Sequence, residues 1–172
     1  RVSPVSAWYW RPGEGDCRRA WSNRLARLQG AAAQLEPLLR HGATPTPPPG
    51  EAWAEGARRQ IDQEQRAVTA PEAVALFREW PELAGRRHLL DLGGGPGRVA
   101  LTLAQTFPDL RATVLDWPAT AEVAREHIAE AGLADRVVAL GGDITVCDPG
   151  QGYDVIWCSS VLHFVAEPEA VL

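Results

Sequence analysis

Lysine and methionine are absent from this chain of 172 residues, and cysteine occurs only three times. All 17 positively charged side chains are therefore arginines. The absence of lysine excludes a Schiff-base nucleophile and also the phosphate-binding lysine of a P-loop. The three cysteines stand far apart without a CxxC spacing. This spacing argues against a zinc site or a disulfide framework and favours a reducing, cytoplasmic environment.

A basic cluster and a long apolar run are also missing. The formal net charge is −5 at pH 7, which argues against a nucleic-acid backbone as the main partner. No apolar run approaches the length that crosses a membrane, and the first residues lack the pattern of a signal peptide. Because the chain has no initiator methionine, we expect a fragment or a trimmed product of a longer protein.

The N-terminal half has a helical pattern. Leucines and alanines at spacings of three and four predict a helix over residues 16–40 with one apolar stripe. A proline-rich connector follows at 44–50. Two further helices are predicted at 51–66 and 71–79, the second with Pro71 in its first turn.

After residue 87, strands and helices alternate. The predicted elements are strand 88–92, helix 97–107, strand 111–116, helix 119–132, strand 136–140, strand 153–159 and a helix from 167 onward. Such units imply an α/β fold with a doubly wound, mostly parallel, Rossmann-like sheet and with ligands at the carboxyl ends of its strands. About four strands make an incomplete sheet with an exposed edge, so we expect the parent protein to continue beyond Leu172.

A glycine-rich sequence, DLGGGPG at residues 91–97, runs from the first of these strands into a helix. Glycines there let a ligand approach the backbone closely. The sequence GPGRVA at 95–100 also satisfies the GxGxxA fingerprint of a nicotinamide dinucleotide site, but it begins late relative to the strand end. Asp91 is expected at the mouth of the loop, where it would repel a pyrophosphate. S-adenosylmethionine has no phosphate and carries an ammonium and a sulfonium, which a carboxylate attracts.

Two more acids follow the next strands. Asp116 ends the second strand, where its two oxygens can accept both ribose hydroxyls of either cofactor. Asp143 follows the third strand, where a carboxylate can accept from an adenine amino group while Ile144 packs on the ring. The alternative for Asp143 is an ordinary turn aspartate after two glycines. Acids at three successive strand ends favour S-adenosylmethionine over a dinucleotide.

Four segments together resemble the class I S-adenosylmethionine-dependent O-methyltransferases, a group of plant caffeic-acid-type enzymes and bacterial enzymes of secondary metabolism. These segments are residues 89–97, 114–118, 135–144 and 153–163. The resemblance covers 85–172 and is fainter over 25–84. It implies a methyltransferase domain over 85–172, truncated at its C-terminus, after a helical segment over 1–84 that is the remnant of a dimerisation domain.

The resemblance implies that S-adenosyl-L-methionine is the cofactor and that a homodimer methylates a hydroxyl of a small-molecule acceptor. It implies a cofactor site formed by Asp91, Gly93, Gly95, Asp116, Asp143, Ile144 and Ser159. It also places His163 where family members carry the general base that takes a proton from the acceptor. The sequence departs from the family after this residue, because Phe164-Val165 stand where the family has Asp-Trp. No acid cluster typical of metal-dependent methyltransferases is visible, so no metal is predicted.

Two other functions stay open at this point. One is an NAD(P)-dependent oxidoreductase, and the other is a degenerate cofactor-binding module without catalysis, which the missing Asp-Trp motivates. Arg98 could reach a cofactor carboxylate, but a solvated helix arginine is expected. The remaining histidines, His41, His88 and His127, are expected to be surface or packing residues.

Overall fold

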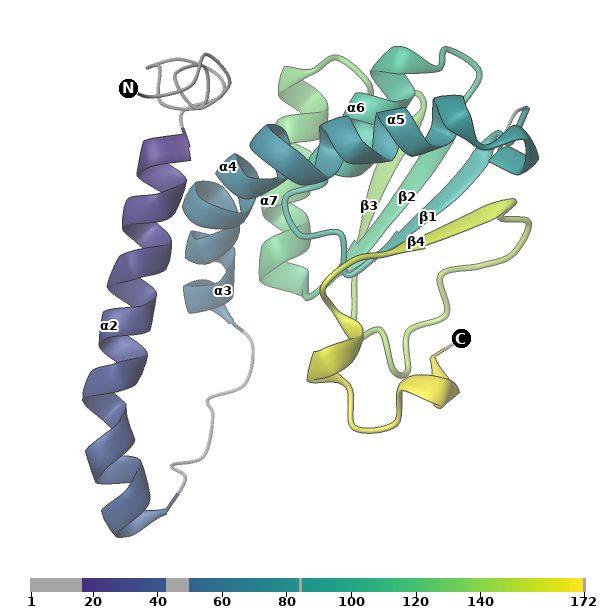
Figure 1. Cartoon of the computed structure of the whole chain (residues 1–172). Helices are drawn as coiled ribbons and strands as arrows, with labels where there is room; N and C mark the ends of the chain where they lie inside the picture. Colours follow the sequence, from purple (N-terminus) through teal and green to yellow (C-terminus); the bar gives the residue numbers. More distant parts are fainter. Residues whose placement is uncertain (1–16, 43–49, 84, 172) are drawn as a thin grey trace. The chain divides into compact units, whose positions relative to one another are not determined.

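A computed structural model of the chain describes residues 17–42, 50–83 and 85–171 (Figure 1). The chain divides into two compact units, Arg1–Pro48 and Pro49–Leu172. The described part of the first unit is one helix, α2 (Cys17–His41), close to the predicted range. Four leucines of its predicted stripe are more than half exposed, namely Leu25, Leu28, Leu35 and Leu39. Apart from Gly50, the predicted connector at 44–50 lies outside the described residues.

The second unit begins with a continuous helical run. It comprises α3 (Glu51–Gly56), α4 (Asp62–Glu64) and α5 (Ala70–Glu79), joined by π-helical turns over Ala57–Ile61 and Gln65–Thr69. The backbone is right-handed helical at every junction, so the predicted break before Pro71 does not occur. A proline ring clashes with the preceding turn of a regular α-helix, and here a wider π-helical turn over Gln65–Thr69 precedes Pro71.

Four parallel strands form the sheet. They are β1 (His88–Leu92), β2 (Arg111–Asp116), β3 (Val137–Gly141) and β4 (Val155–Cys158), in the spatial order β3-β2-β1-β4. The chain runs outward from β1 through β2 to β3 and then returns to the other side of β1. This order confirms the predicted doubly wound α/β fold. It places the topological switch point between β1 and β4, where such sheets bind ligands.

Two crossover helices cover one face of the sheet. They are α6 (Arg98–Thr106), between β1 and β2, and α7 (Pro118–Glu130), between β2 and β3. Right-handed crossovers that run in the same direction place both helices on the same face, and α5 packs on α6 (Figure 1). Strand residues such as Leu89 and Val114 are fully buried against Leu103 of α6, so the main core lies in this layer.

The other face of the sheet has a thinner cover. Leu90, Leu92 and Leu115 pack there against partly buried side chains from the segment that joins β3 to β4. Two short 3-10 turns, Leu162–Phe164 and Pro168–Ala170, follow β4, and the second stands where a helix was predicted from 167 onward.

The boundary between the compact units differs from the predicted division at residues 84 and 85. The helical run from 51 to 79 packs on α6 and α7, and it therefore belongs with the sheet. In the part of the chain that the structure describes, no helix is both long enough and apolar enough to cross a membrane.

Candidate cofactor site

The carboxyl ends of the strands bring the glycine loop and the segment after β4 together. The register pairs Leu92 of β1 with Cys158 of β4, so Ser159 follows beside Gly93. A β-carbon at Gly93 would overlap the side chain of Val161, which shows that this side chain lies against the loop. The segment leaving β4 therefore closes over the start of the glycine loop.

Asp91 is a buried carboxylate beneath this loop. It is 2% exposed, and a β-carbon on Gly94 would lie 2.7 Å from its Oδ2 atom. Oδ2 has no hydrogen-bond partner within the described residues. Burial, and secondly the charge of Asp116, raise the pKa of Asp91 to about 7, although a backbone hydrogen bond from Ala100 opposes the rise. The expectation of a carboxylate at the open mouth of the loop was wrong, because β1 carries Asp91 below the loop backbone.

Asp116 joins the end of β2 to the loop. Its Oδ2 accepts a hydrogen bond from the Gly95 N–H at 2.8 Å, and its Oδ1 accepts one from the Trp117 N–H at 2.7 Å. Burial raises the pKa of Asp116, and these two backbone donors oppose the rise. Each carboxylate oxygen has a second lone pair, so Asp116 can still accept from two hydroxyls of a ligand.

Four backbone donors of the loop and of the first turn of α6 bind acceptors within the protein. Gly93 donates to Leu115 O at 2.7 Å, Gly95 to Asp116 Oδ2 at 2.8 Å, Gly97 to Gly94 O at 3.1 Å and Arg98 to Gln65 Oε1 at 3.1 Å. A phosphate site at a helix N-terminus needs such N–H groups directed at the ligand. In this loop they are directed at a carboxylate, a side-chain amide and two carbonyls.

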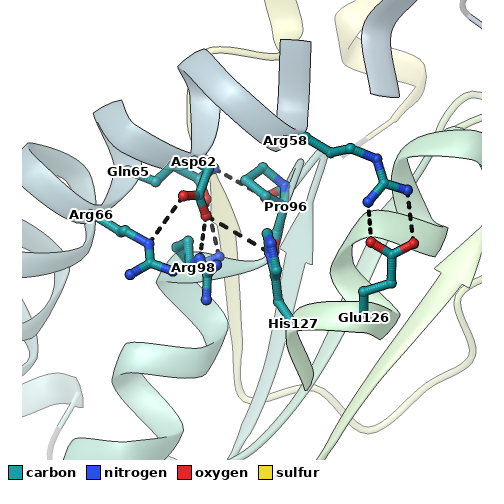
Figure 2. Close-up of polar contacts among 9 residues, drawn as sticks. Arg58, Asp62, Gln65, Arg66, Pro96, Arg98, Glu126 and His127 are labelled. Carbon is teal, nitrogen blue, oxygen red and sulfur yellow. Dashed lines mark hydrogen bonds and ion pairs between the residues drawn. The ribbon is translucent and has the colours of Figure 1, made fainter. Parts of the chain in front are cut away.

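The helical run from 51 to 79 supplies a layer of contacts to the loop that sequence reasoning missed. The Gln65 amide nitrogen donates to Gly94 O at 3.1 Å, while its oxygen accepts from the Arg98 N–H. Asp62, one turn earlier, forms an ion pair with Arg98 and another with Arg66, at 3.1 Å (Figure 2). A spacing of three places Asp62 and Gln65 on one helix face, which the sequence does show, but nothing in the sequence identifies their partners.

The same network holds Arg98 and His127. The Arg98 side chain is only 13% exposed because Asp62 binds it, so the prediction of a solvated arginine was wrong. The ring nitrogen Nδ1 of His127, on α7, lies 3.0 Å from Pro96 O and 3.8 Å from Asp62 Oδ1 (Figure 2). The loop is thus held by the helical run on one side and by α7 on another.

Asp143 lies next to the end of β2 but forms a local turn. The Gly142 N–H donates to Asp116 O at 2.9 Å, which brings the two acids to neighbouring strand ends. Asp143 Oδ1 accepts from the backbone N–H of Thr145 at 2.9 Å and from its hydroxyl at 2.7 Å. Ile144 lines a cleft of about 230 Å³ on the thinly covered face of the sheet, with Leu92 and Leu115. Of the predicted cofactor residues, this cleft contains Ile144 alone.

Ser159 and His163 follow β4. Ser159 is partly buried directly after the strand. His163 is exposed on the turn Leu162–Phe164, with its ring centroid 3.9 Å from that of Phe164. The Phe164 ring in turn meets Trp53 of α3 edge-on, at 5.0 Å between centroids. Within the described residues the His163 ring makes this aromatic contact and no hydrogen bond.

The order of the strands, the loop and the acids at the strand ends agrees with a comparison against known families. The family model described as an O-methyltransferase domain matches residues 55–171. The chain belongs to this family.

Curated relatives are similar over all or part of the chain. The chain is 28% identical to the 3-hydroxy-5-methyl-1-naphthoate 3-O-methyltransferase of Streptomyces sahachiroi, over 95% of this chain and 48% of that protein. It is 43% identical to the aclacinomycin 10-hydroxylase of Streptomyces purpurascens, over 59% of this chain and 26% of that one. Among solved structures, the mitomycin 7-O-methyltransferase matches with a TM-score of 0.57 and 25% identity, over 98% of this chain and 48% of that chain. The chain spans about half the length, or less, of these relatives.

Substitution of Gly94 by alanine tests the close packing of the loop on Asp91. The new β-carbon would lie 2.6 Å from Asp91 Cγ and 2.8 Å from Val114 Cγ1, both buried. We expect Gly94→Ala to lower the free energy of unfolding by about 2 kcal/mol or more, as overpacking does. Gly56→Ala is the control, because nothing lies within 4 Å of its β-carbon position. It should leave stability unchanged or raise it by about 0.5–1 kcal/mol. Denaturant unfolding measures both, and equal effects would contradict the described packing.

The raised pKa of Asp91 predicts a pH-dependent stability. Between its ordinary value of 3.8 and about 7, the folded protein holds a proton that the unfolded chain releases. Stability from this group is therefore full below pH 4 and is lost as the pH rises through 7. In Asp91→Asn this group no longer titrates. The free energy of unfolding of the variant, relative to that of the natural chain, should therefore be higher at pH 8 than at pH 5. Between pH 5 and pH 8 the difference should be roughly 2.6 kcal/mol. A difference between the two proteins that does not vary with pH would contradict the prediction.

Proposed function

We propose that this chain is the cofactor-binding part of an S-adenosylmethionine-dependent O-methyltransferase that acts on a hydroxyl of a small aromatic acceptor. The observation that carries the proposal is the internal pairing of the glycine loop. Four of the backbone N–H groups that a pyrophosphate would need donate instead to Asp116, to Gln65 and to carbonyl groups. A cofactor without phosphate does not need these donors.

The charge of the site supports the same cofactor. Asp91 has a buried oxygen without a partner, and Asp116 is near enough to raise the pKa of Asp91. A pyrophosphate beside two acids would be repelled, whereas an ammonium and a sulfonium would be attracted. The residues present therefore fit S-adenosylmethionine and disfavour a nicotinamide dinucleotide.

Each acid at the strand ends has a proposed role. Asp116 accepts the ribose hydroxyls with the lone pairs that its two backbone donors leave open. Asp143 accepts from the adenine amino group through Oδ2, while Ile144 packs beside the ring. Gly93 and Gly95 give the cofactor access to the backbone, and Ser159 borders the site from β4. Asp91 lies below the loop, where a cationic cofactor would favour its charged form.

The reaction places a second requirement on the site. When bound, the cofactor supplies a methyl group on a positively charged sulfur that a hydroxyl oxygen can attack. A phenol ordinarily has a pKa of about 10, so a base within hydrogen-bond reach assists its deprotonation at neutral pH. We assign this role to His163, which is exposed two residues after Val161, the residue that lies against the glycine loop. Alignment of the acceptor with the methyl group would supply much of the remaining acceleration.

The wider setting is also part of the proposal. Exposed leucines along α2 support a homodimer in which that stripe is covered. The scarcity of cysteine supports a cytoplasmic location. The similarity to a relative named a hydroxylase supports a second candidate, a cofactor-binding protein that does not transfer a methyl group. The role of His163 separates the two candidates.

Binding of S-adenosylhomocysteine, measured by calorimetry, tests the cofactor site. Asp116→Asn and Asp143→Asn should each raise the Kd roughly tenfold or more, because each removes a charged acceptor. Asp109→Asn is the matched control, since this exposed aspartate lies before the amino end of β2 and should leave the Kd unchanged. Equal affinity in all four proteins would overturn the assignment.

Methyl transfer to a panel of phenols tests the base. His163→Gln should lower turnover by about 10²–10⁴-fold without changing the Kd for S-adenosylhomocysteine. His41→Gln, at an exposed histidine of the other compact unit, should leave turnover unchanged. Full turnover in His163→Gln would exclude the base. A natural chain that binds the cofactor but methylates none of the phenols would favour the second candidate.

A further inference from the structure

The peptide group between Gly94 and Gly95 is held at both ends by side chains. Its carbonyl oxygen accepts from the Gln65 amide nitrogen at 3.1 Å, and its N–H donates to Asp116 Oδ2 at 2.8 Å. The C=O and N–H of a trans peptide point in opposite directions. Gln65 and Asp116 therefore bind opposite edges of one rigid peptide. A rotation of this peptide would change both contacts together.

The loop itself holds this peptide weakly. Both flanking residues are glycines, and Gly95 has a φ of 60°, so no side chain limits rotation of the peptide. Within the loop, the Gly97 N–H also donates to Gly94 O at 3.1 Å. Gln65 contacts that carbonyl from outside the loop, and it thereby links the peptide to a helix.

The helix that carries Gln65 is itself fixed against the loop. Asp62 binds Arg98, and the methyl carbon Cγ2 of Ile61 lies 3.4 Å from the β-carbon position of Gly95. Gln65 begins a π-helical turn, a local widening that often occurs at functional sites. Its oxygen accepts from Arg98, whose first-turn N–H has no acceptor inside α6. One side chain thus contacts both the loop and the start of the helix that follows it.

We propose that Gln65 is a positioning residue of the cofactor site. It fixes the Gly94–Gly95 peptide, and through that peptide it fixes the carboxylate of Asp116 in the orientation that receives the ribose. The identity of the ligand rests on the proposed function. The effect of Gln65 on the peptide and on Asp116 is expected in the unliganded chain as well, so it can be tested independently of which ligand binds.

Two variants separate the contacts of Gln65. Gln65→Leu removes both hydrogen bonds while keeping a side chain of similar size. Gln65→Glu retains an oxygen for the Arg98 N–H but loses the donor to Gly94 O. Arg58→Ala is the matched control, because it breaks the ion pair with Glu126 that ties the same helical run to α7 and does not contact the loop (Figure 2).

Hydrogen exchange of single backbone amides in the unliganded chain, followed by NMR, is the first test. In Gln65→Leu, the Gly95 and Arg98 amides should both exchange about tenfold faster than in the natural chain, because Arg98 loses its acceptor and the peptide that carries the Gly95 N–H loses the bond to its carbonyl. In Gln65→Glu, Gly95 should exchange faster while Arg98 stays protected. Arg58→Ala should change neither. Unchanged exchange at Gly95 in both Gln65 variants, with the fold intact by circular dichroism, would overturn the proposal.

A double-mutant cycle with S-adenosylhomocysteine is the second test. Gln65→Leu should raise the Kd about tenfold in the natural chain and have little further effect beside Asp116→Asn, because Gln65 acts through Asp116. Equal losses in the two backgrounds would show an independent effect and overturn the proposal. If the natural chain binds no S-adenosylhomocysteine, the proposed function fails, and the exchange measurement still decides the role of Gln65.

Discussion

The hydrogen bond from the Gly95 N–H to Asp116 connects the loop after β1 with the end of β2, and the rest of the site is arranged around it. Parallel pairing of β1 and β2 brings the two groups to the same edge of the sheet. The contact turns the Gly95 donor inward, joins the carboxyl ends of the neighbouring strands β1 and β2, and holds Asp116 near the buried Asp91. Gln65 and His127 then hold the loop from outside.

This arrangement explains why a glycine-rich loop of the dinucleotide type suits a different cofactor. Glycine loops bind phosphate when their N–H groups face the ligand. Here a carboxylate takes one of those donors, and a second carboxylate lies beneath the loop with a raised pKa because its charge is buried and near a like charge. A cation at the site would relieve that repulsion, so the same backbone shape selects a ligand of opposite charge.

The sequence predicted the layout of the sheet well and the support of the loop poorly. Periodic apolar strands, glycines and acids at strand ends are local signals, so β1 to β4 and the acids Asp91, Asp116 and Asp143 could be located from residue patterns alone. The contacts of Gln65 with Gly94 and of Asp62 with Arg98 join residues 29 and 36 positions apart, and a single sequence carries no signal for such pairs. The burial of Asp91 was missed for the same reason, since it depends on packing between distant segments.

The central claim is that inward-facing donors and two adjacent acids select a phosphate-free, positively charged cofactor. Calorimetric titration of the natural chain with S-adenosylhomocysteine, and separately with NAD⁺, tests it most directly. The homocysteine product keeps the ammonium and ribose of the cofactor, so we expect it to bind while NAD⁺ gives no heat of binding. Binding of NAD⁺ without binding of S-adenosylhomocysteine would contradict the claim.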